Sequence, residues 1–361
     1  MPCRDEGGSA VHSRRWPARA ARALAVAAVA AATVVGCTSA ESDWESSPPV
    51  TVAATAQPLR APAWSAALSA LVALTDDGRL ARVDEPDDPD RVGTAVSGPL
   101  AAGDNLRISG IDPHRVFVPR PDRQTVTLMD LDTLRPVEEV RAGPAPNSVD
   151  ANAGLRVLLV LSEDGRSVTP VDEHGLAALP TATVEGAAAE SVIGSARGRR
   201  VDYHLFHRGG VRHYRGAERS PEQLGALAVP VAAAAADHTK TTRSYVAAGD
   251  TVRAVESQRG GDGLAVIGEV AVPAGSVRYL AADDTRLYIA TDRALVVART
   301  ASFTGYPDGA IPIIRVIDYR DELPAGPARS AEPSGLAVGT HRVYLTLAGQ
   351  PYLVSIAKPG L

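Results

Sequence analysis

Three histidines lie close together in the 361-residue chain: His204, His207 and His213. Imidazole nitrogens bind metal ions and serve as general bases, so such a group is a candidate for chemistry. The surrounding alternation predicts a strand, in which His204 and His207 lie on opposite faces. With Gly209-Gly210 as a hairpin turn, Phe206 pairs with His213, and His213 shares a face with His204 only. Two imidazoles do not form a metal site without a carboxylate from elsewhere, so we expect no metal here.

Sequence motifs for nucleophilic catalysis are missing. The chain has no G-x-S-x-G motif, and the glycine-rich stretch 259–263 lacks the Lys-Ser/Thr and the helix of a phosphate-binding loop. A Ser/His/Asp set assembled from distant segments stays open, because several histidines lie in predicted loops or strand ends: His114, His174, His238 and His341. Without a local motif, we expect the chain not to be an enzyme.

Cys37 has the clearest chemical context of any residue. Four arginines between positions 14 and 22 precede an uncharged run of small and apolar residues, 23–36. That run is too short to span a bilayer and has the length of a signal-peptide core. It ends in Val34-Val35-Gly36-Cys37, which resembles the bacterial lipobox. The resemblance implies that Val34, Val35 and Gly36 are recognised by the signal peptidase and that the Cys37 thiol is acylated.

The lipobox resemblance leads to a domain organisation and a location. We expect a lipoprotein signal peptide over 1–36 and the lipidated Cys37 with a flexible tether over 37–63. A membrane-anchored domain on the extracytoplasmic side would follow, because two or more acyl chains give stable anchoring. Ser13-Arg14-Arg15 is also similar to a twin-arginine signal, without the usual apolar pair after it, so the export route stays open.

Composition excludes several classes of protein. The formal net charge of −5 argues against a nucleic-acid binder, which needs a basic face. Two cysteines, Cys3 and Cys37, are too few for a disulfide scaffold or an iron–sulfur site. Tryptophan is scarce as well, with Trp64 the only one beyond the tether, and we expect no cofactor. With three Phe and three Trp, the core must consist of Val, Leu, Ile and Ala.

The rest of the chain is one repeated unit. A β-branched run, a turn of Asp, Gly or Arg residues and a second alternating run recur at a spacing of about 40–45 residues, which is typical of β-propeller blades. The seven copies cover 71–84, 116–130, 157–172, 201–214, 245–255, 287–298 and 343–356. We therefore predict an all-β fold, a seven-bladed β-propeller over 64–361. The last repeat has no obvious outer strand after Ile356, and we expect Val50–Ala53, which alternates like a strand, to close the ring as that strand.

One stretch of the repeat resembles a known family. Residues Thr125–Asp130, Thr133–Val140 and Gly143–Val149 are similar to the YVTN-type β-propeller repeat, although Pro119 and Ser162 stand where the family has Asn. The resemblance implies the propeller fold in a bacterial, actinobacterial-like lipoprotein. It does not imply an activity, because propellers host binding, scaffolding and several chemistries.

Two irregular insertions, 215–224 and 299–311, interrupt the repeat. The second contains Phe303, Tyr306 and Asp308, and aromatic residues in a loop indicate a contact surface. We therefore expect a monomeric, non-catalytic binding or scaffolding module whose partner is a protein, a peptide or an envelope polymer. The alternative is a lactonase-like hydrolase or lyase, which would need histidines and carboxylates converging near one mouth of the central channel.

Overall fold

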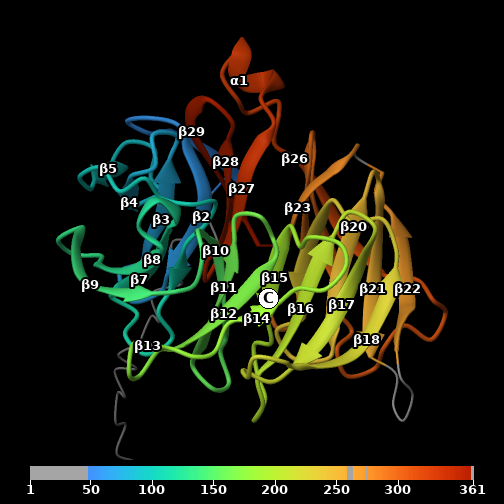
Figure 1. Cartoon of the computed structure of the whole chain (residues 1–361). Coiled ribbons are helices and arrows are strands. Elements are labelled where there is room, and N and C mark those ends of the chain that lie inside the picture. Colours follow the sequence, from blue (N-terminus) through green and yellow to red (C-terminus); the bar gives the residue numbers. More distant parts are fainter. Residues whose placement is uncertain (1–47, 258–262, 274, 359–361) are drawn as a thin grey trace, which may run out of the picture. The chain divides into compact units, whose positions relative to one another are not determined.

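The computed structural model describes residues 48–257, 263–273 and 275–358. They form seven small antiparallel sheets, the blades of a propeller (Figure 1). Blade 1 consists of β2 (Leu59–Ser65), β3 (Ala70–Thr75), β4 (Leu80–Asp84) and β5 (Gly93–Val96). Blade 2 consists of β6 (Arg107–Ile108), β7 (Arg115–Arg120), β8 (Thr125–Asp130) and β9 (Arg135–Arg141). Blade 3 consists of β10 (Pro146–Asn152), β11 (Val157–Ser162), β12 (Ser167–Asp172), β13 (Ala177–Ala178) and β14 (Ala182–Thr183).

Blades 4 to 7 continue in the same order around the ring. Blade 4 consists of β15 (Ser191–Gly194), β16 (Asp202–His207), β17 (Gly210–Arg215) and β18 (Glu222–Ala228), and blade 5 of β19 (Ala233–Ala236), β20 (Arg243–Ala248), β21 (Thr251–Ser257) and β22 (Leu264–Ala271). Blade 6 consists of β23 (Val277–Ala282), β24 (Arg286–Thr291), β25 (Ala294–Arg299) and β26 (Ile313–Asp318). Blade 7 consists of β27 (Pro333–Val338), β28 (Arg342–Leu347), β29 (Gln350–Ala357) and β1 (Val50–Ala54). The seven-bladed, all-β prediction is confirmed.

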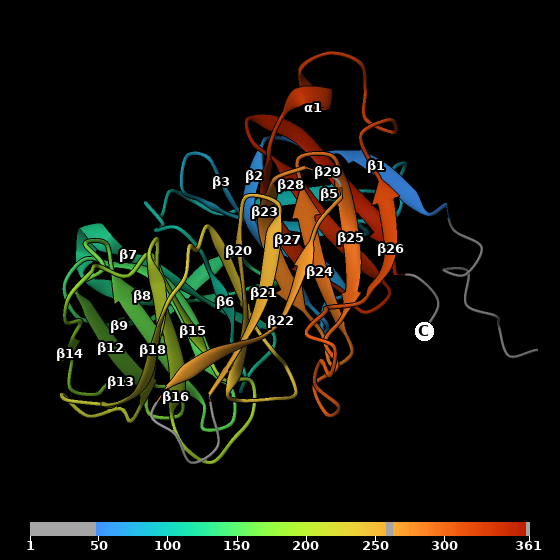
Figure 2. The same cartoon turned by 90° about the vertical axis from the view of Figure 1, so that its right-hand side faces the viewer.

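The ring closes as predicted. β1 is the outer strand of blade 7 and pairs antiparallel with β29, from Val50 opposite Ile356 to Ala54 opposite Tyr352. Figure 2 shows β1 beside the strands formed by the end of the chain. The buried Arg342 of β28 fixes the start of β1, because its guanidinium donates to the Pro48 carbonyl oxygen at 3.1 and 3.2 Å. The first described residues are therefore part of the ring.

Apolar packing between blades holds the ring together. The second strand of each blade is almost wholly buried, as in β3 and β11, since a neighbouring blade covers each of its faces. In the described residues, the hydrophobic clusters match the seven blade interfaces; Leu159 with Leu205 joins blades 3 and 4, and Val246 with Phe206 joins blades 4 and 5. The clusters consist mainly of Val, Leu, Ile and Ala, as the composition predicts.

One local prediction is wrong, and one feature of repeat six was not predicted. The β16–β17 turn is Arg208-Gly209, so His204 rather than Phe206 pairs with His213. Repeat six is long for two reasons: besides 300–312, the 319–332 segment between blades 6 and 7 adds a short helix, α1 (Pro327–Ser330). A second helical turn, the 3-10 segment Pro121–Arg123, joins β7 to β8. None of the helices in the described part of the chain is long and apolar enough to cross a bilayer.

The strand order defines two faces of the ring. In each blade, the loop between the first and second strands and the loop between the third and fourth strands lie on the same face, which we call the tether face. Residue 48 enters the ring on this face, at the start of β1. The opposite face holds the turns between second and third strands and the connections between blades. Both irregular insertions belong to the tether face, which is where the candidate site lies.

Candidate functional site

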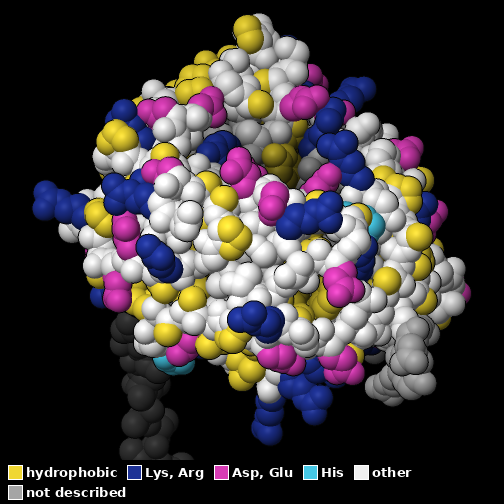
Figure 3. All heavy atoms as spheres, in the orientation of Figure 1, with side chains coloured by type: hydrophobic (Ala, Val, Ile, Leu, Met, Phe, Trp, Pro, Cys, Tyr) yellow, Lys and Arg dark blue, Asp and Glu magenta, His cyan; other side chains and the backbone are white. Residues whose placement is uncertain are grey.

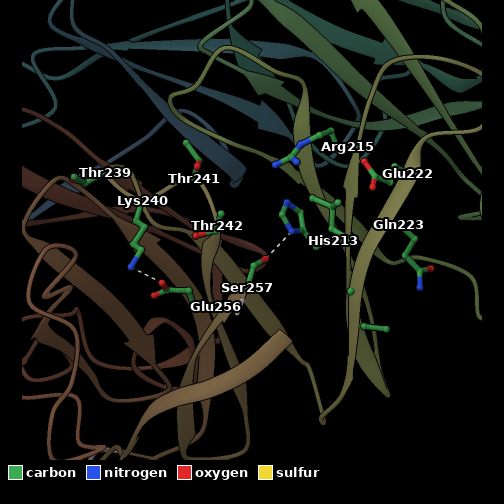
Figure 4. A pocket seen from close by; sticks show the side chains of 13 residues that line it. His213, Arg215, Glu222, Gln223, Thr239, Lys240, Thr241, Thr242, Glu256 and Ser257 are labelled. Atoms are coloured by element: carbon green, nitrogen blue, oxygen red, sulfur yellow. Dashed lines mark hydrogen bonds and ion pairs between the residues drawn. The ribbon is translucent and has the colours of Figure 1, made fainter. Parts of the chain in front are cut away.

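A polar pocket opens between blades 4 and 5 on the tether face (Figure 4). Its volume is about 710 Å³. Blade 4 contributes the end of β17 and the start of β18, and blade 5 contributes the 239–242 loop and the end of β21. Hydroxyl, amide and charged side chains dominate the lining: His213, Arg215, Glu222, Gln223, Thr239, Lys240, Thr241, Thr242, Glu256 and Ser257. Pockets with several converging polar groups are the first place to look for a ligand.

His213 connects the two walls of this pocket. Its Nδ1 lies 2.8 Å from the Ser257 hydroxyl oxygen on blade 5, and its Nε2 lies 3.6 Å from a carboxylate oxygen of Asp202 on blade 4. The first distance is a hydrogen bond, whereas the second is an ion-pair distance. Arg215 donates to the same Asp202 oxygen at 2.8 Å. Serine, imidazole and carboxylate are thus in the order used for nucleophilic catalysis.

Electrostatics keep the Asp202 carboxylate ionised. Burial alone would raise the pKa of Asp202, but the neighbouring His213 and Arg215 outweigh it and lower that pKa below its usual value. His213 itself has no exposed side-chain surface. The His204 ring stacks on it at 4.4 Å between centroids, and burial keeps the pKa of His204 well below its usual value. His204 and His213 therefore do share a face, as expected, but as a stacked pair.

A buried salt-bridge network forms the blade 5 wall. Arg243, 1% exposed, donates to one Glu256 carboxylate oxygen through Nε at 2.8 Å and Nη2 at 2.7 Å, and Lys240 pairs with the other. Burial disfavours the charge on Arg243, yet the hydrogen bond and the charge of Glu256 leave its pKa raised. Arg243 Nη1 also donates to the Thr300 carbonyl oxygen at 2.9 Å. The network thus links the pocket to the insertion of blade 6.

Asp237 anchors that insertion a second time. Its carboxylate accepts the backbone N–H groups of Thr239 and Lys240 at 2.8 Å, which shapes the loop that lines the pocket. The Ser302 hydroxyl donates to the same carboxylate at 2.7 Å, and the Tyr245 hydroxyl at 2.9 Å. The pocket wall and residues 300–302 therefore form one hydrogen-bonded unit across blades 5 and 6.

The three predicted contact residues have different environments. Tyr306 is 8% exposed: its ring lies over Gly268 of β22, and its hydroxyl donates to the Thr300 carbonyl oxygen at 2.6 Å. It fastens the insertion to blade 5 and does not face solvent. Phe303, in contrast, is 90% exposed, and Asp308 is exposed as well. Phe303 is thus the exposed aromatic side chain of this loop.

Further backbone bonds hold the loop against blade 5. The Glu269 N–H donates to the Gly309 carbonyl oxygen at 2.9 Å, and the Ile311 N–H donates to the Glu269 carbonyl oxygen at 3.0 Å. Ala310 thereby forms a parallel bridge to β22. The segment between Ser302 and Tyr306, which contains Phe303, is fixed at both ends.

Other predicted site residues are not brought together here. The loop histidines His114, His174, His238 and His341 all belong to the tether face, but each comes from a different blade. Within the described ranges, no group of three or more His, Cys, Asp or Glu side chains is arranged to hold a metal ion. Cys37 and the Val34, Val35 and Gly36 residues before it lie outside the described residues.

Sequence reasoning singled out His213 and the 215–224 insertion on the blade 4 side of the pocket, but it did not identify the residues on the blade 5 side. Ser257, Glu256 and the 239–242 loop belong to segments without any local motif, and they meet His213 only through the packing of blade 5 on blade 4. One signal was present: Lys240 is one of two lysines, the other being Lys358, in a chain that otherwise uses arginine. Asp202, two residues before His204, could also have been paired with the histidines by strand periodicity.

Comparisons with known proteins show the fold of this chain and nothing more. No family model matches the chain, and no curated protein matches it. Among solved structures, a chain in a crystal structure of the mitotic checkpoint complex matches with a TM-score of 0.64 and 12% identity, over 87% of this chain and 95% of that one. A structure of U3-55K matches with a TM-score of 0.63 and 10% identity, over 86% and 98%. At such low identity the chain shares their propeller fold, and nothing about its activity follows.

Proposed function

We propose that this chain is a bacterial lipoprotein, anchored through Cys37 on the extracytoplasmic side of the membrane, whose propeller binds a protein partner through the tether face. The observation that carries the proposal is Phe303, a 90% exposed aromatic side chain on a loop fastened at both ends. Aromatic anchors of this kind dominate the binding energy of protein interfaces. A loop that is already ordered loses little conformational entropy on binding, so more of the contact energy is kept.

The position of the tether supports a partner close to the membrane. Ten residues lie between Cys37 and Pro48, so a fully extended connection would reach about 37 Å. It joins the ring at blade 7, on the same face as Phe303 of the neighbouring blade 6. A ring held this way has its tether face within reach of the membrane surface. The expected partner is therefore the extracytoplasmic part of a membrane protein or another membrane-attached protein.

The test is cross-linking of the lipidated protein in its own membranes, followed by identification of the cross-linked chain. Phe303→Ala should reduce the yield of a specific partner by roughly tenfold, the effect of removing an interface anchor. The matched control is Val137→Ala on β9, which truncates an apolar side chain that is 48% exposed on blade 2. Equal yields from wild type and Phe303→Ala would refute the proposal.

A hydrolase is the second candidate function, and the Ser257–His213–Asp202 arrangement favours it. In such a reaction His213 Nδ1 takes the proton of Ser257 while the serine oxygen attacks the acyl carbon of an ester. The imidazolium returns that proton to the departing alcohol, and water then releases the acid and frees the serine. Asp202, ionised and facing Nε2, would stabilise the imidazolium.

Hydrolysis is testable separately from partner binding. A reactive serine would be labelled by a fluorophosphonate probe and would cleave p-nitrophenyl acetate, and Ser257→Ala would abolish both. Ser276→Ala, which removes an exposed hydroxyl on the opposite face, is the control. If the wild-type protein is neither labelled nor active, Ser257 is a structural hydroxyl that joins blades 4 and 5, and the binding function stands without catalysis.

A further inference from the structure

A second pocket lies on the opposite face, between blades 6 and 7. Its volume is about 380 Å³, and its walls are the β24–β25 turn, the start of β23 and the 320–332 segment that contains α1. Figure 3 shows basic and acidic side chains side by side around the hollow below this segment. Four arginines and three carboxylates line the pocket: Arg278, Arg293, Arg320 and Arg329 with Asp292, Asp321 and Glu332. Basic groups are thus in excess here, although acidic residues outnumber them in the whole chain.

The carboxylates of this pocket pair with some of its arginines and not with others. Arg278 uses two of the three acids, with Nε at 2.5 Å from Asp292 and Nη2 at 2.7 Å from Glu332. Arg320 donates to the backbone carbonyl oxygens of Asp292 and Ala328 instead. A carbonyl oxygen orients a guanidinium without cancelling its charge, so Arg320 keeps a net positive charge beside the pocket.

The other two arginines extend this pattern. Arg329 donates to the carbonyl oxygens of Leu323 at 2.9 Å and Asp321 at 3.1 Å. Arg293, exposed at the β24–β25 turn, has no side-chain hydrogen bond or ion pair with any other residue in the described ranges. Two oriented guanidinium groups and one free group therefore surround a cavity large enough for a small ion.

We propose that this pocket binds a phosphate group, either as the free ion or as part of an anionic polymer. A guanidinium matches two phosphate oxygens with two parallel N–H donors, and the charged hydrogen bonds that result are about twice as strong as neutral ones. Arg320 and Arg329 are already held by backbone carbonyls, so little side-chain entropy is lost on binding. Arg293 would supply the contact that the unliganded site leaves open.

The test is titration calorimetry of the intact propeller at low salt, with inorganic phosphate in one arm and short-chain polyphosphate in the other. We expect saturable binding in at least one arm, and Arg293→Gln should weaken it roughly tenfold, as the loss of a charge-assisted bond predicts. The matched control is Arg208→Gln, which removes the same charge from the equivalent turn of blade 4 on the same face.

The arms separate the sources of the phosphate. Saturation by inorganic phosphate identifies the free ion as sufficient, whereas saturation by polyphosphate alone identifies a polymer ligand. The proposal is overturned if neither ligand saturates, or if Arg208→Gln weakens binding as much as Arg293→Gln does. In the second case the overall charge of the face, rather than this pocket, attracts the anion. Both substitutions are at exposed turn positions, so folding is not at issue.

Discussion

His204 should make the stability of the propeller depend on pH. Its side chain is 2% exposed and stacks on His213, and burial, reinforced by His213 and opposed by Asp202, lowers its pKa well below 6.5. The unfolded chain takes up a proton near pH 6.5, whereas the folded protein keeps His204 neutral. As pH falls below 6.5, the unfolded state binds the extra proton, so the free energy of unfolding decreases.

The size of this effect follows from proton linkage. One proton taken up by the unfolded state alone changes the free energy of unfolding by at most about 1.4 kcal/mol per pH unit. Between pH 7 and pH 5.5 the integrated limit is about 1.3 kcal/mol, reached if His204 stays neutral in the folded protein throughout. His204→Phe removes this proton site and keeps a ring that can stack on His213 and contact Phe206, whose centroid lies 6.0 Å from that of His204. It also removes an Nε2 that has no hydrogen-bond partner among the described residues.

Urea unfolding at pH 7 and pH 5.5 provides the measurement. The wild type should lose about 1 kcal/mol more than His204→Phe does between the two pH values. His174→Gln, which changes an exposed histidine in the β12–β13 loop, is the control and should behave like the wild type. Identical pH dependence of the wild type and His204→Phe would show that the unfolded and folded states bind the His204 proton equally, contrary to the reasoning.

Three further changes test other parts of the structure. Cys37→Ser should move the protein from the membrane fraction to the soluble fraction. If its fractionation is unchanged, the prediction of a lipid anchor on Cys37 is wrong. Deletion of residues 48–56 should lower the melting temperature by several degrees, because β29 loses its partner strand and Arg342 loses its Pro48 acceptor. An unchanged melting temperature would exclude closure through β1. Gly268→Val should displace Tyr306, since even a Cβ at position 268 would lie 2.6 Å from the Tyr306 ring. We expect faster proteolysis within 300–311 as a result. Gly263→Val is the control, because a Cβ there has no neighbouring atom within 4 Å.

The fold was predictable because its signals are local. Alternating β-branched residues and turns such as Asp76-Asp77-Gly78 specify each hairpin within some fifteen residues of sequence, and Gly78 adopts the positive φ of 74° that such a turn requires. Repetition then specifies the ring, since one blade cannot bury both faces. Closure was accessible as well, because the last repeat lacks an outer strand after Ile356 and Val50–Ala53 alternates like a strand.

The candidate site was not predictable in the same way. Ser257 and His213 are 44 residues apart, and their hydrogen bond depends on how blade 5 packs on blade 4. A one-residue error in the β16–β17 turn was enough to place Phe206 opposite His213 and to hide the stacked histidine pair. The burial of Tyr306 depends on a glycine in another blade, Gly268, and no pattern within 299–311 reports it.

The charged network between blades 4, 5 and 6 is itself an argument for function. Burying Arg243, Glu256 and Asp202 removes their hydration, and the ion pairs recover that free energy only in part, so such networks contribute little net stability. Apolar side chains such as Leu74, Val116 and Met129 close the contact between blades 1 and 2, where Arg82 of blade 1 also donates to the Leu131 carbonyl oxygen of blade 2. Apolar clusters join blades 4 to 6 as well, so the ion pairs there come in addition to the packing that closes the ring. The polar residues there line a cavity and hold the loop that exposes Phe303, and this is the part of the tether face on which the proposed binding role rests.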